Sequence, residues 1–255
     1  MPSKMPFRID LEHHKHMVWA YAKYTFASTF SYRIPYFSSS YAISAPVPSP
    51  STIKLALVAS AINRDGNVET GKMLFEKIRD SAVTVELPEK LIAFKAFMKR
   101  LKQKRKGQET TIKTSFGELV ERFESTFGIR EYIIYDGPLN IYIEVSDESS
   151  AQEVMRYFKA IQYFGSSDSI CTCLETGLSD PDWQKCISQA NAGSEKIQNK
   201  GMIFLLTDFT GKATFDSINP FSGRKLKRGE LLLKPYFFPI EVVKKDKNCV
   251  IYKRL

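Results

Sequence analysis

The residues with the clearest potential for chemistry are cationic, and they are concentrated in one short stretch of the chain. Residues 95–106 hold seven Lys and Arg residues and no acid, whereas the rest of the chain carries only +2 of the formal net charge of +9. Like charges at this density repel one another, and a phosphate backbone neutralises them with release of counterions. We therefore expect this stretch to bind a polyanion; a solvated helix face is the alternative. The seven residues are Lys95, Lys99, Arg100, Lys102, Lys104, Arg105 and Lys106.

A second candidate anion site lies where a helix is expected to begin. Ser49 followed by Pro50 is typical of an N-cap residue followed by proline at the first helical position, and residues 53–63 have the apolar spacing of a buried helix. The preceding residues 45–52 are rich in proline and hydroxyl groups, which restrains the backbone. Free N–H groups at a helix N-terminus attract anions. The alternative is a well-capped helix without a ligand.

Three histidines are the only candidates for acid–base catalysis near neutral pH. His13, His14 and His16 lie together near the start of the chain. An imidazole serves as a general acid or base near pH 7, as a metal-independent ribonuclease requires. A solvated terminal segment is the alternative that their position favours. The chain contains no P-loop, dinucleotide-binding glycine motif, nucleophile elbow or H-E-x-x-H motif, so we predict no catalytic residue.

Metal and cofactor sites are not expected either. Cys171 and Cys173 form a C-x-C pair, while Cys186 and Cys249 are distant from it and from each other. Zinc sites usually combine two closely spaced cysteine pairs, or one such pair with spaced histidines, and neither pattern occurs here. We interpret all four cysteines as structural.

The elements that must position these residues follow from apolar periodicity and from capping signals. Residues 91–106 have helical apolar spacing, so the basic stretch is predicted to lie on a helix that ends at Gly107. The other elements predicted up to residue 175 are strands at 17–30, 82–87, 131–135, 139–145 and 169–175, and helices at 53–63, 69–80, 116–127 and from a capping box at 150–153 to Gly165.

This order of elements is that of a ferredoxin-like βαββαβ unit, which many RNA-binding proteins use. We predict an α+β fold in which residues 1–175 form this unit, with a basic insert at about 89–127. Residues 176–255 are predicted to form a strand-rich carboxyl-terminal extension, which contains a second basic loop at 219–229. The elements predicted in this extension are a helix at 182–192 and strands at 202–209, 231–243 and 250–252.

The composition is that of a folded chain. Of the 255 residues, 43% are apolar and 13% are aromatic, which is enough for a core and excludes wholesale disorder. The longest apolar runs are far shorter than the ~20 residues of a membrane helix. Charged residues also interrupt the start of the chain, where a signal peptide needs an apolar stretch. We therefore expect a soluble, cytoplasmic protein without membrane contact.

Several short motifs occur in order along residues 17–175. An aromatic first strand is followed by Ser-Tyr-Arg-Ile-Pro at 31–35, by Ala-Pro-Val-Pro-Ser-Pro-Ser-Thr-Ile at 45–53, by residues 132–145 and by Tyr-Phe-Gly-Ser-Ser-Asp-Ser at 163–169. In this order and spacing the sequence resembles the fifth CRISPR-associated (Cas) family, the small RAMP-type subunit of type I Cascade. The second motif is similar to the family's proline-rich P-x-P-S-x-x element, and the last is similar to its Y-L-G-x-S-x stretch.

The resemblance implies a specific role. Such subunits grip the repeat-derived 5′ handle of the guide RNA (crRNA), and they abut the first backbone subunit and the large subunit near the point where the PAM of the target DNA is recognised. An insert after the second ferredoxin-like strand commonly forms a thumb across the RNA, and the basic stretch at 95–106 falls in that interval. Family thumbs are often β-hairpins, whereas the spacing here predicts a helix.

The resemblance also assigns RNA contacts outside the basic stretch. They fall before and at the start of the first helix and in the glycine motif, and we add the second basic loop to them. These residues are Arg33, Tyr36, Ser49, Ser51, Thr52, Lys54, Gly165, Ser166, Arg224 and Lys225.

Some members of this family process precursor RNA themselves, so more than one function stays open. We favour a non-catalytic RNA clamp; the alternative is a metal-independent endoribonuclease that processes precursor crRNA with the histidines near the start of the chain. The related sixth Cas family, which does process RNA, carries a glycine-rich loop near its carboxyl terminus, whereas residues 223–229 contain only two glycines. A third interpretation is a ferredoxin-like RNA-binding protein outside CRISPR systems.

Overall fold

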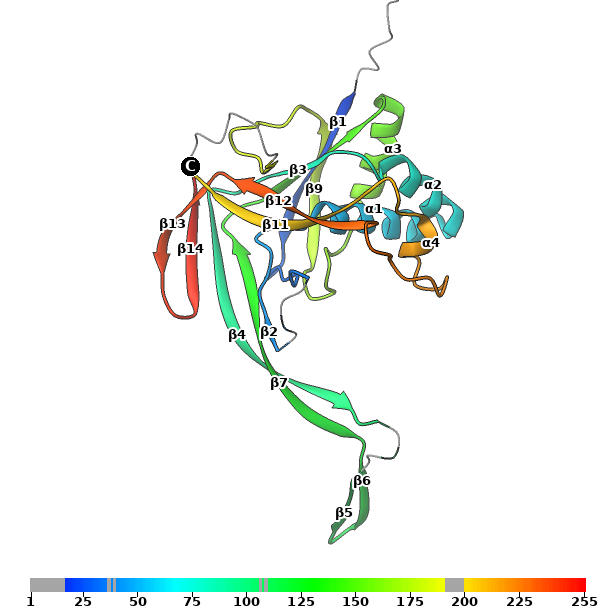
Figure 1. The fold of residues 1–255 in the computed structure, drawn as a ribbon, viewed down its shortest axis with the longest axis vertical. Helices are drawn as coiled ribbons and strands as arrows, with labels where there is room; N and C mark the ends of the chain where they lie inside the picture. Colours follow the sequence, from blue (N-terminus) through cyan, green and yellow to red (C-terminus); the bar gives the residue numbers. More distant parts are fainter. Residues whose placement is uncertain (1–16, 36–37, 39, 106, 108–109, 191–199) are drawn as a thin grey trace, which may run out of the picture.

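The computed structural model describes residues 17–35, 38, 40–105, 107, 110–190 and 200–255. It consists of a body, in which helices pack on a sheet, and a long two-stranded arm that extends away from the body (Figure 1). Helices and strands occur in one mixed architecture, so the predicted combination of both is confirmed at this level.

The central sheet has four strands in the spatial order β3, β8, β1, β9, and each neighbouring pair is antiparallel. The central strand β1 turns Ala20, Ala22 and Tyr24 into the core, because every second side chain of a strand faces the same side. The four strands are β1 (Val18–Phe26), β3 (Val83–Glu86), β8 (Leu139–Val145) and β9 (Cys171–Leu178).

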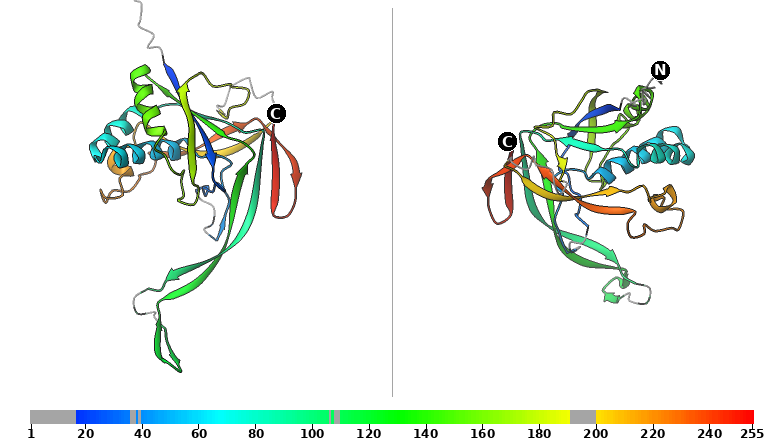
Figure 2. Two further views of the ribbon diagram at one scale, coloured as in Figure 1. Left: turned by 180° about the vertical axis from the view of Figure 1, so that it is seen from behind. Right: turned by 45° about the horizontal axis from the view of Figure 1, so that its top comes forward.

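Three helices lie on the same side of this sheet (Figure 2). α1 (Pro50–Asp65) and α2 (Val68–Ile78) connect β1 to β3, and α3 (Glu148–Phe158) connects β8 to β9. Their apolar faces bury Leu57 and Tyr157 against the sheet and against one another. A short fourth helix, α4 (Phe215–Ile218), follows later in the chain.

The start of α1 agrees with its prediction. Ser49 is the N-cap residue in extended conformation and Pro50 opens the helix. The helix ends at Gly66, which has φ of +64° and donates its N–H to the carbonyl oxygen of Ile62. Glycine adopts this left-handed conformation without a steric penalty.

The predicted start of α3 is wrong by one turn. Asp147 is the N-cap, and its carboxylate accepts from the backbone N–H of Ser150 at 2.8 Å. Hydrogen bonds from the Ser146 hydroxyl and from Ser150 lower the pKa of Asp147 to about 2. The helix ends at Phe158 rather than at Gly165.

The arm replaces two predicted helices with strands. Residues 91–106 lie mainly in β4 (Lys90–Gln103), and residues 116–127 lie mainly in β6 (Gly117–Glu121) and β7 (Phe123–Tyr135). β4 pairs with β7 without interruption along the arm, and β5 (Thr110–Thr114) pairs with β6 at its tip. Helical spacing of apolar residues is only weak evidence for a helix. Here the backbone hydrogen bonds between β4 and the distant strand β7 decide the structure instead.

The last third of the chain adds strands to the earlier ones. A five-stranded sheet has the order β13, β14, β4, β7, β2, so the strands of the arm's base are flanked on one edge by carboxyl-terminal residues. A three-stranded sheet has the order β10, β12, β11. These strands are β2 (Tyr41–Ala42), β10 (Ser188–Gln189), β11 (Met202–Phe209), β12 (Leu231–Phe238), β13 (Ile240–Lys245) and β14 (Cys249–Arg254).

Predictions for this last third are partly correct. The strand predicted at 202–209 is confirmed as β11, whereas the segment 231–243 is two strands that Pro239 separates, since proline has no N–H to donate to a ladder. The helix predicted at 182–192 is wrong up to residue 190, where turns and β10 occur, and its last two residues lie outside the described ones. Among the described residues, no helix is both long and apolar enough to cross a bilayer.

Core hydrogen bonding gives the first prediction. The hydroxyl of the fully buried Tyr24 donates to the carbonyl oxygen of Phe158 at 2.7 Å, and so ties β1 to the end of α3. Tyr24→Phe removes this short bond, and the buried carbonyl keeps the longer one from the Ile161 N–H at 3.2 Å, so we expect the free energy of unfolding in urea to fall by about 1 kcal/mol. In the control Tyr21→Phe, the hydroxyl bonded to Glu175 at the surface is removed instead, and a change below about 0.5 kcal/mol is expected. Equal effects of the two variants would show that the buried bond adds no stability.

Candidate nucleic-acid interface

The arm carries the described residues of the predicted cationic stretch away from the body. β7 has 13 residues, which corresponds to a length of roughly 40 Å at the rise of an antiparallel strand. The register runs from Leu91 opposite Tyr135 at the base to Gln103 opposite Phe123. Beyond this point β5 and β6 form the tip (Figure 1). The predicted cationic stretch is therefore one strand of a hairpin.

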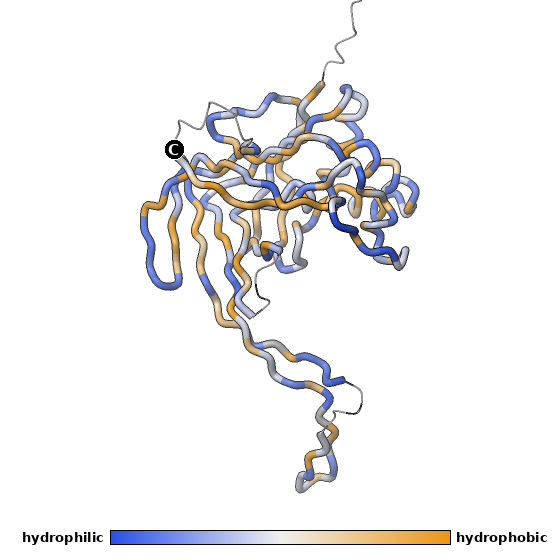
Figure 3. The backbone as a smooth tube through the Cα atoms, in the orientation of Figure 1, coloured by the Kyte–Doolittle hydropathy of each residue, from blue (hydrophilic) through white to orange (hydrophobic). Residues whose placement is uncertain are grey.

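One face of the arm combines cations with exposed apolar side chains. We call it the aromatic face; its members are Phe97, Lys99, Leu101, Phe123 and Phe127. The rings of Phe97 and Phe127 stack at a centroid distance of 5.5 Å and an interplanar angle of 19°, and the Lys99 Nζ lies 6.0 Å from the Phe127 centroid. Phe97 remains 68% and Phe127 59% exposed. Along the arm, hydrophobic and hydrophilic residues alternate (Figure 3).

Such a face is suited to an unpaired nucleic-acid strand. Exposed rings stack on bases of any sequence, and nearby ammonium groups attract the phosphates. Large exposed apolar surfaces are otherwise unfavourable in water and mark interaction sites.

On the opposite face of the arm, acidic side chains of the paired strand neutralise part of the positive charge. Lys102 lies opposite Glu124 in the register, with 4.0 Å between Nζ and Oε1, and Lys113 lies 3.9 Å from Glu118 at the tip. Residues 89–127 together hold ten Lys and Arg against five Glu, a net charge of +5. Lys102 of the cationic stretch thus receives an acid from the paired strand, and the arm as a whole remains basic.

The other predicted RNA-binding residues of the arm differ in how far their side chains are exposed and able to contact RNA. At the base, Lys95 lies over the ring of Tyr41 at 5.1 Å, and its hydrogen bond with Tyr41 raises the pKa of Lys95. Lys104 is half-buried and donates from Nζ to Thr110 Oγ1 at 2.8 Å, while Arg105 is exposed. Arg100 lies in β4 with its side chain outside the described parts, and Lys106 is not among the described residues.

The start of α1 is not the exposed corner that the sequence suggests. Four predicted contact residues are buried there, with exposures of 4% or less. The Ser51 hydroxyl lies 2.6 Å from that of Thr207 in β11, so this sheet covers the first turn of the helix. Burial keeps a phosphate backbone from contacting these side chains directly in the chain by itself. The four residues are Ser49, Ser51, Thr52 and Lys54.

Lys54 has an internal role instead. It is fully buried, and its Nζ donates to Asp208 Oδ1 at 2.8 Å and to the carbonyl oxygen of Arg79 at 2.8 Å. Lys234 approaches the other carboxylate oxygen of Asp208 at 3.2 Å. Burial lowers the pKa of Lys54, because it disfavours the charged form, and the Asp208 carboxylate opposes this shift. This buried ion pair joins α1 to β11, so we leave Lys54 out of the proposed RNA surface.

The glycine motif does lie beside the start of α1, as expected. A Cβ at Gly165 would lie 2.7 Å from the Tyr32 ring and 3.6 Å from the Thr52 methyl group, and Gly165 has φ of +73°. The Ser166 hydroxyl donates to the Ser31 carbonyl oxygen at 3.2 Å. Arg33 is exposed nearby.

The second basic loop lies near α4, at the helical end of the body and away from the arm (Figure 1). Arg224 donates to the buried carboxylate of Glu230 at 2.7 Å and to Thr214 Oγ1 at 2.9 Å, so it holds the loop together. Lys225 is exposed. Tyr36, the remaining predicted residue, lies outside the described residues, as do the three histidines.

Metal and thiol chemistry find no support in the described part of the chain. No group of three or more His, Cys, Asp or Glu residues that could hold a metal ion occurs among the residues described. The four cysteines are unpaired, and burial raises the pKa of Cys171 and of Cys186 to about 12. Such thiols stay protonated at neutral pH and are poor nucleophiles.

Sequence reasoning misses the rings that make the arm distinctive. Phe97, Lys99 and Leu101 stand at every second position, which places them on one face if the segment is a strand. Within this short stretch of sequence, however, the helical spacing of the neighbouring apolar residues is the stronger signal. Tyr32 and Tyr163 stand out in the sequence only as parts of motifs, although both rings border a pocket beside α1.

Comparison with known proteins gives the family. No protein-family model matches the chain. A curated relative, "CRISPR-associated protein Cas5" from Archaeoglobus fulgidus, is 36% identical over 237 residues, which cover 91% of this chain and 96% of the relative. The chain belongs to the Cas5 family. The resemblance to the fifth CRISPR-associated family is thereby confirmed.

Two solved structures are also similar to this Cas5-family chain. A crystal structure of a CRISPR protein from Archaeoglobus fulgidus has a TM-score of 0.42 and 12% identity, covering 93% of this chain and 92% of the other. A chain of a CRISPR RNA-guided surveillance complex has a TM-score of 0.42 and 13% identity, covering 86% of this chain and 90% of the other.

The buried ion pair gives the second prediction. Asp208→Asn leaves the Lys54 ammonium buried without its counter-charge, so we expect the free energy of unfolding to fall by about 3 kcal/mol or more. Adding Lys54→Met to that variant removes the unpaired charge, and part of the loss should be recovered. The matched control is Lys72→Gln, which breaks the exposed pair with Glu69 and is expected to leave the free energy of unfolding close to that of the unmodified chain. A loss in Asp208→Asn no larger than in this control would contradict the assignment.

Proposed function

We propose that this Cas5-family chain is a non-catalytic RNA-binding subunit of a type I CRISPR Cascade complex that holds the 5′ handle of the crRNA. One observation carries the proposal beyond family membership. A basic hairpin projects from the body and presents stacked, exposed phenylalanine rings beside lysines on one face. Rings and cations in this combination suit single-stranded RNA.

The arm is the proposed thumb across the RNA. Its position in the chain, between the second and third strands of the central sheet, is that of the thumb implied by the family resemblance. Its form is a β-hairpin, as thumbs of this family often are. The bases would lie against the aromatic face, with the phosphates beside Lys95 and Lys99 of the same face. Lys102 would reach the phosphates from the opposite face, and Arg105 would do so from beyond the end of β4.

The body is the proposed ferredoxin-like unit of RAMP type. Helices connect the first strand to the second and the third to the fourth, and the strand order β3, β8, β1, β9 is the one that such a unit requires. The boundary expected at residue 175 falls inside β9, so we place it after Leu178, with the later residues as a strand-rich extension. The arm corresponds to the insert at about 89–127.

The proposed partners follow from the same role. The backbone subunit and the large subunit of the complex would contact this chain, and the PAM end of the target DNA would lie nearby. The outer face of β11 exposes Ile203 and Leu205, which supplies apolar surface for a protein neighbour. The assembly is expected to work in the cytoplasm.

Electrostatics supplies the third prediction. Neutralising Lys99, Arg100, Lys102 and Arg105 together to Gln should weaken binding of repeat-derived RNA and reduce its salt dependence, by about 0.7 in the log–log slope for each phosphate that the arm no longer neutralises. Fluorescence anisotropy at several salt concentrations measures both. The control variant removes four lysines from another exposed hairpin, Lys244, Lys245, Lys247 and Lys253, and should leave the slope near that of the unmodified chain. An arm variant with an unchanged slope would mean that the arm touches no phosphate.

Ring stacking supplies the fourth prediction. Phe97→Ala with Phe127→Ala removes the stacked pair, and the affinity for the same RNA should fall about tenfold or more while the salt slope stays unchanged, because base stacking is uncharged. Trp183→Ala removes an aromatic ring that is 55% exposed on the body, outside the assigned RNA contacts, and serves as the control. If the double variant binds as tightly as the control does, the aromatic face has no role in RNA binding.

Absence of catalysis is part of the proposal. Precursor repeat RNA incubated with stoichiometric purified protein in EDTA is expected to stay intact. Specific cleavage that disappears when His13, His14 and His16 are all changed to Ala would instead establish the metal-independent endoribonuclease.

A further inference from the structure

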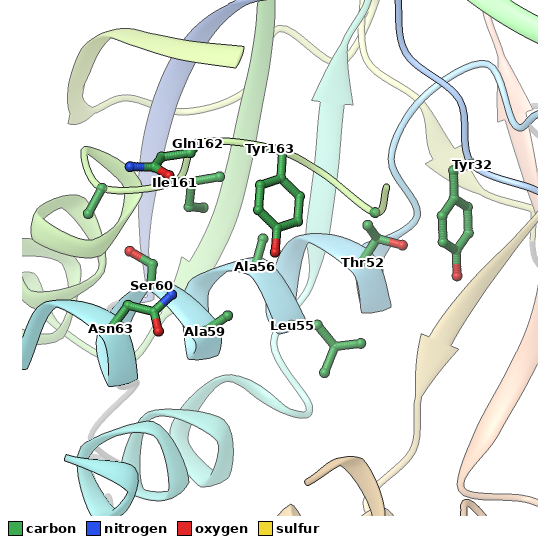
Figure 4. Close-up of a pocket in the computed structure, with 12 residues that line it drawn as sticks. Tyr32, Thr52, Leu55, Ala56, Ala59, Ser60, Asn63, Ile161, Gln162 and Tyr163 are labelled. Carbon is green, nitrogen blue, oxygen red and sulfur yellow. The ribbon is translucent and has the colours of Figure 1, made fainter. Parts of the chain in front are cut away.

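A pocket of about 340 Å³ lies between the exposed side of α1 and the loop that follows α3 (Figure 4). Its floor is made by Leu55, Ala56 and Ala59 of the helix, and two tyrosines, Tyr32 and Tyr163, border it from separate loops. Tyr163 is 47% exposed, and its ring lies over the helix near Ala56. This volume is at the lower end of the range of pockets that take small ligands.

The lining offers no charged side chain to an ionic ligand and therefore favours a neutral one. No Lys, Arg, Asp or Glu is among the twelve residues that line the pocket. Pro50 at the first position of α1 also removes one of the N–H groups that an anion would use. Rings, aliphatic groups and the neutral amides of Asn63 and Gln162 remain. An amide offers a donor and an acceptor side by side, as the edge of a nucleobase does.

Thr52 provides an independent sign of a missing partner. Thr52 is 4% exposed and lines the pocket. Its hydroxyl oxygen is buried and has no hydrogen-bond partner. The hydroxyl lies between the Tyr163 and Tyr32 rings and is directed to the Tyr32 side (Figure 4). Buried hydroxyls are almost always hydrogen-bonded, so an orphan is expected where a ligand supplies the partner.

Gly165 keeps this arrangement possible. Because a Cβ at Gly165 would lie 2.7 Å from the Tyr32 ring, any side chain there would push the ring out of place. The absence of a side chain lets the loop and the ring approach each other beside Thr52. A planar group that enters between the two tyrosines would shift Tyr32 and meet the Thr52 hydroxyl.

We propose that this pocket binds one unpaired nucleobase, held by Tyr163 and Tyr32 and hydrogen-bonded by Thr52. The inference rests on the proposed function, since the base would belong to the RNA held by this chain. It adds a base-specific interaction on the body, whereas the arm supplies stacking and phosphate binding.

The test couples the pocket to single positions of the RNA. Repeat-derived RNAs, each with one abasic position, are titrated against the full chain and against Tyr163→Ala. One position, or two adjacent ones, should weaken binding to the unmodified chain about tenfold, and the same abasic change should have no further effect in Tyr163→Ala. Tyr163→Phe, which keeps the ring, should retain the coupling, and Trp183→Ala, which removes an exposed ring elsewhere on the body, should leave every position as it was.

Thr52→Val separates binding from folding. Valine matches the shape of threonine and removes a hydroxyl that has no partner in the free chain, so stability should not fall, while the affinity for RNA should drop about fivefold. Abasic effects that are identical in the unmodified chain and in Tyr163→Ala at all positions would overturn the inference. So would release of a co-purifying protein subunit by Tyr163→Ala with unchanged RNA affinity, since the pocket would then dock a protein side chain.

A second readout is independent of RNA binding by the whole chain. Methyl NMR signals of Leu55, Ala56 and Ala59 are followed while adenosine, cytidine or uridine is added, and the signals should shift for at least one nucleoside and not in Tyr163→Ala. If the unmodified chain binds no RNA but these signals shift, the proposed function fails and the pocket stands. If no nucleoside shifts them, the pocket assignment is wrong.

Discussion

The backbone pairing of β4 with β7 is the constraint on which the functional surface depends. Its register places Lys99 opposite Phe127 and Phe97 opposite Ile129, and so decides which side chains share a face. A slip of one residue would move every side chain to the other side of the ribbon, and rings and cations would no longer lie together. No helix packs on the described residues of the arm, so this ladder and its cross-strand pairs hold it in shape.

The base of the arm is anchored from two sides. β14 pairs with β4 from Lys253 opposite Lys90 to Cys249 opposite Phe94, and β2 pairs with β7 at Tyr41. The carboxyl-terminal strands are therefore tied to the arm, and the Lys54–Asp208 pair ties β11 to α1. Parts of the chain far apart in sequence thus hold the proposed thumb and the nucleobase pocket on one body.

Local signals in the sequence predict the body well. The alternation in residues 139–145 and the run at 202–209 match β8 and β11, and Ser49 with Pro50 marks the start of α1. Residues 90–103 are mispredicted because Lys, Arg and Leu favour helices and because the partner strand, which decides the outcome, begins only at Phe123. A local window does not contain that partner.

The site is predicted less completely for the same reason. The concentrated charge in the sequence identifies the arm, and the ordered motifs identify the family. In the folded chain, Gly165 of one motif lies close to Thr52 of another. Lys54 looks available in the sequence, yet its counter-charge Asp208 lies 154 residues further on, and only the folded chain brings the two together. The burial of Ser51 under β11 likewise depends on Thr207, far along the chain.

The central claim is that the aromatic face of the arm and the corner beside α1 hold one end of a processed RNA. A density map of the assembled complex, purified from its host with the bound RNA, tests this most directly. The account predicts RNA bases against Phe97 and Phe127, phosphates beside Lys99, and an ordered nucleotide at Tyr163. An arm that points into solvent, together with a corner covered only by polypeptide, would contradict it.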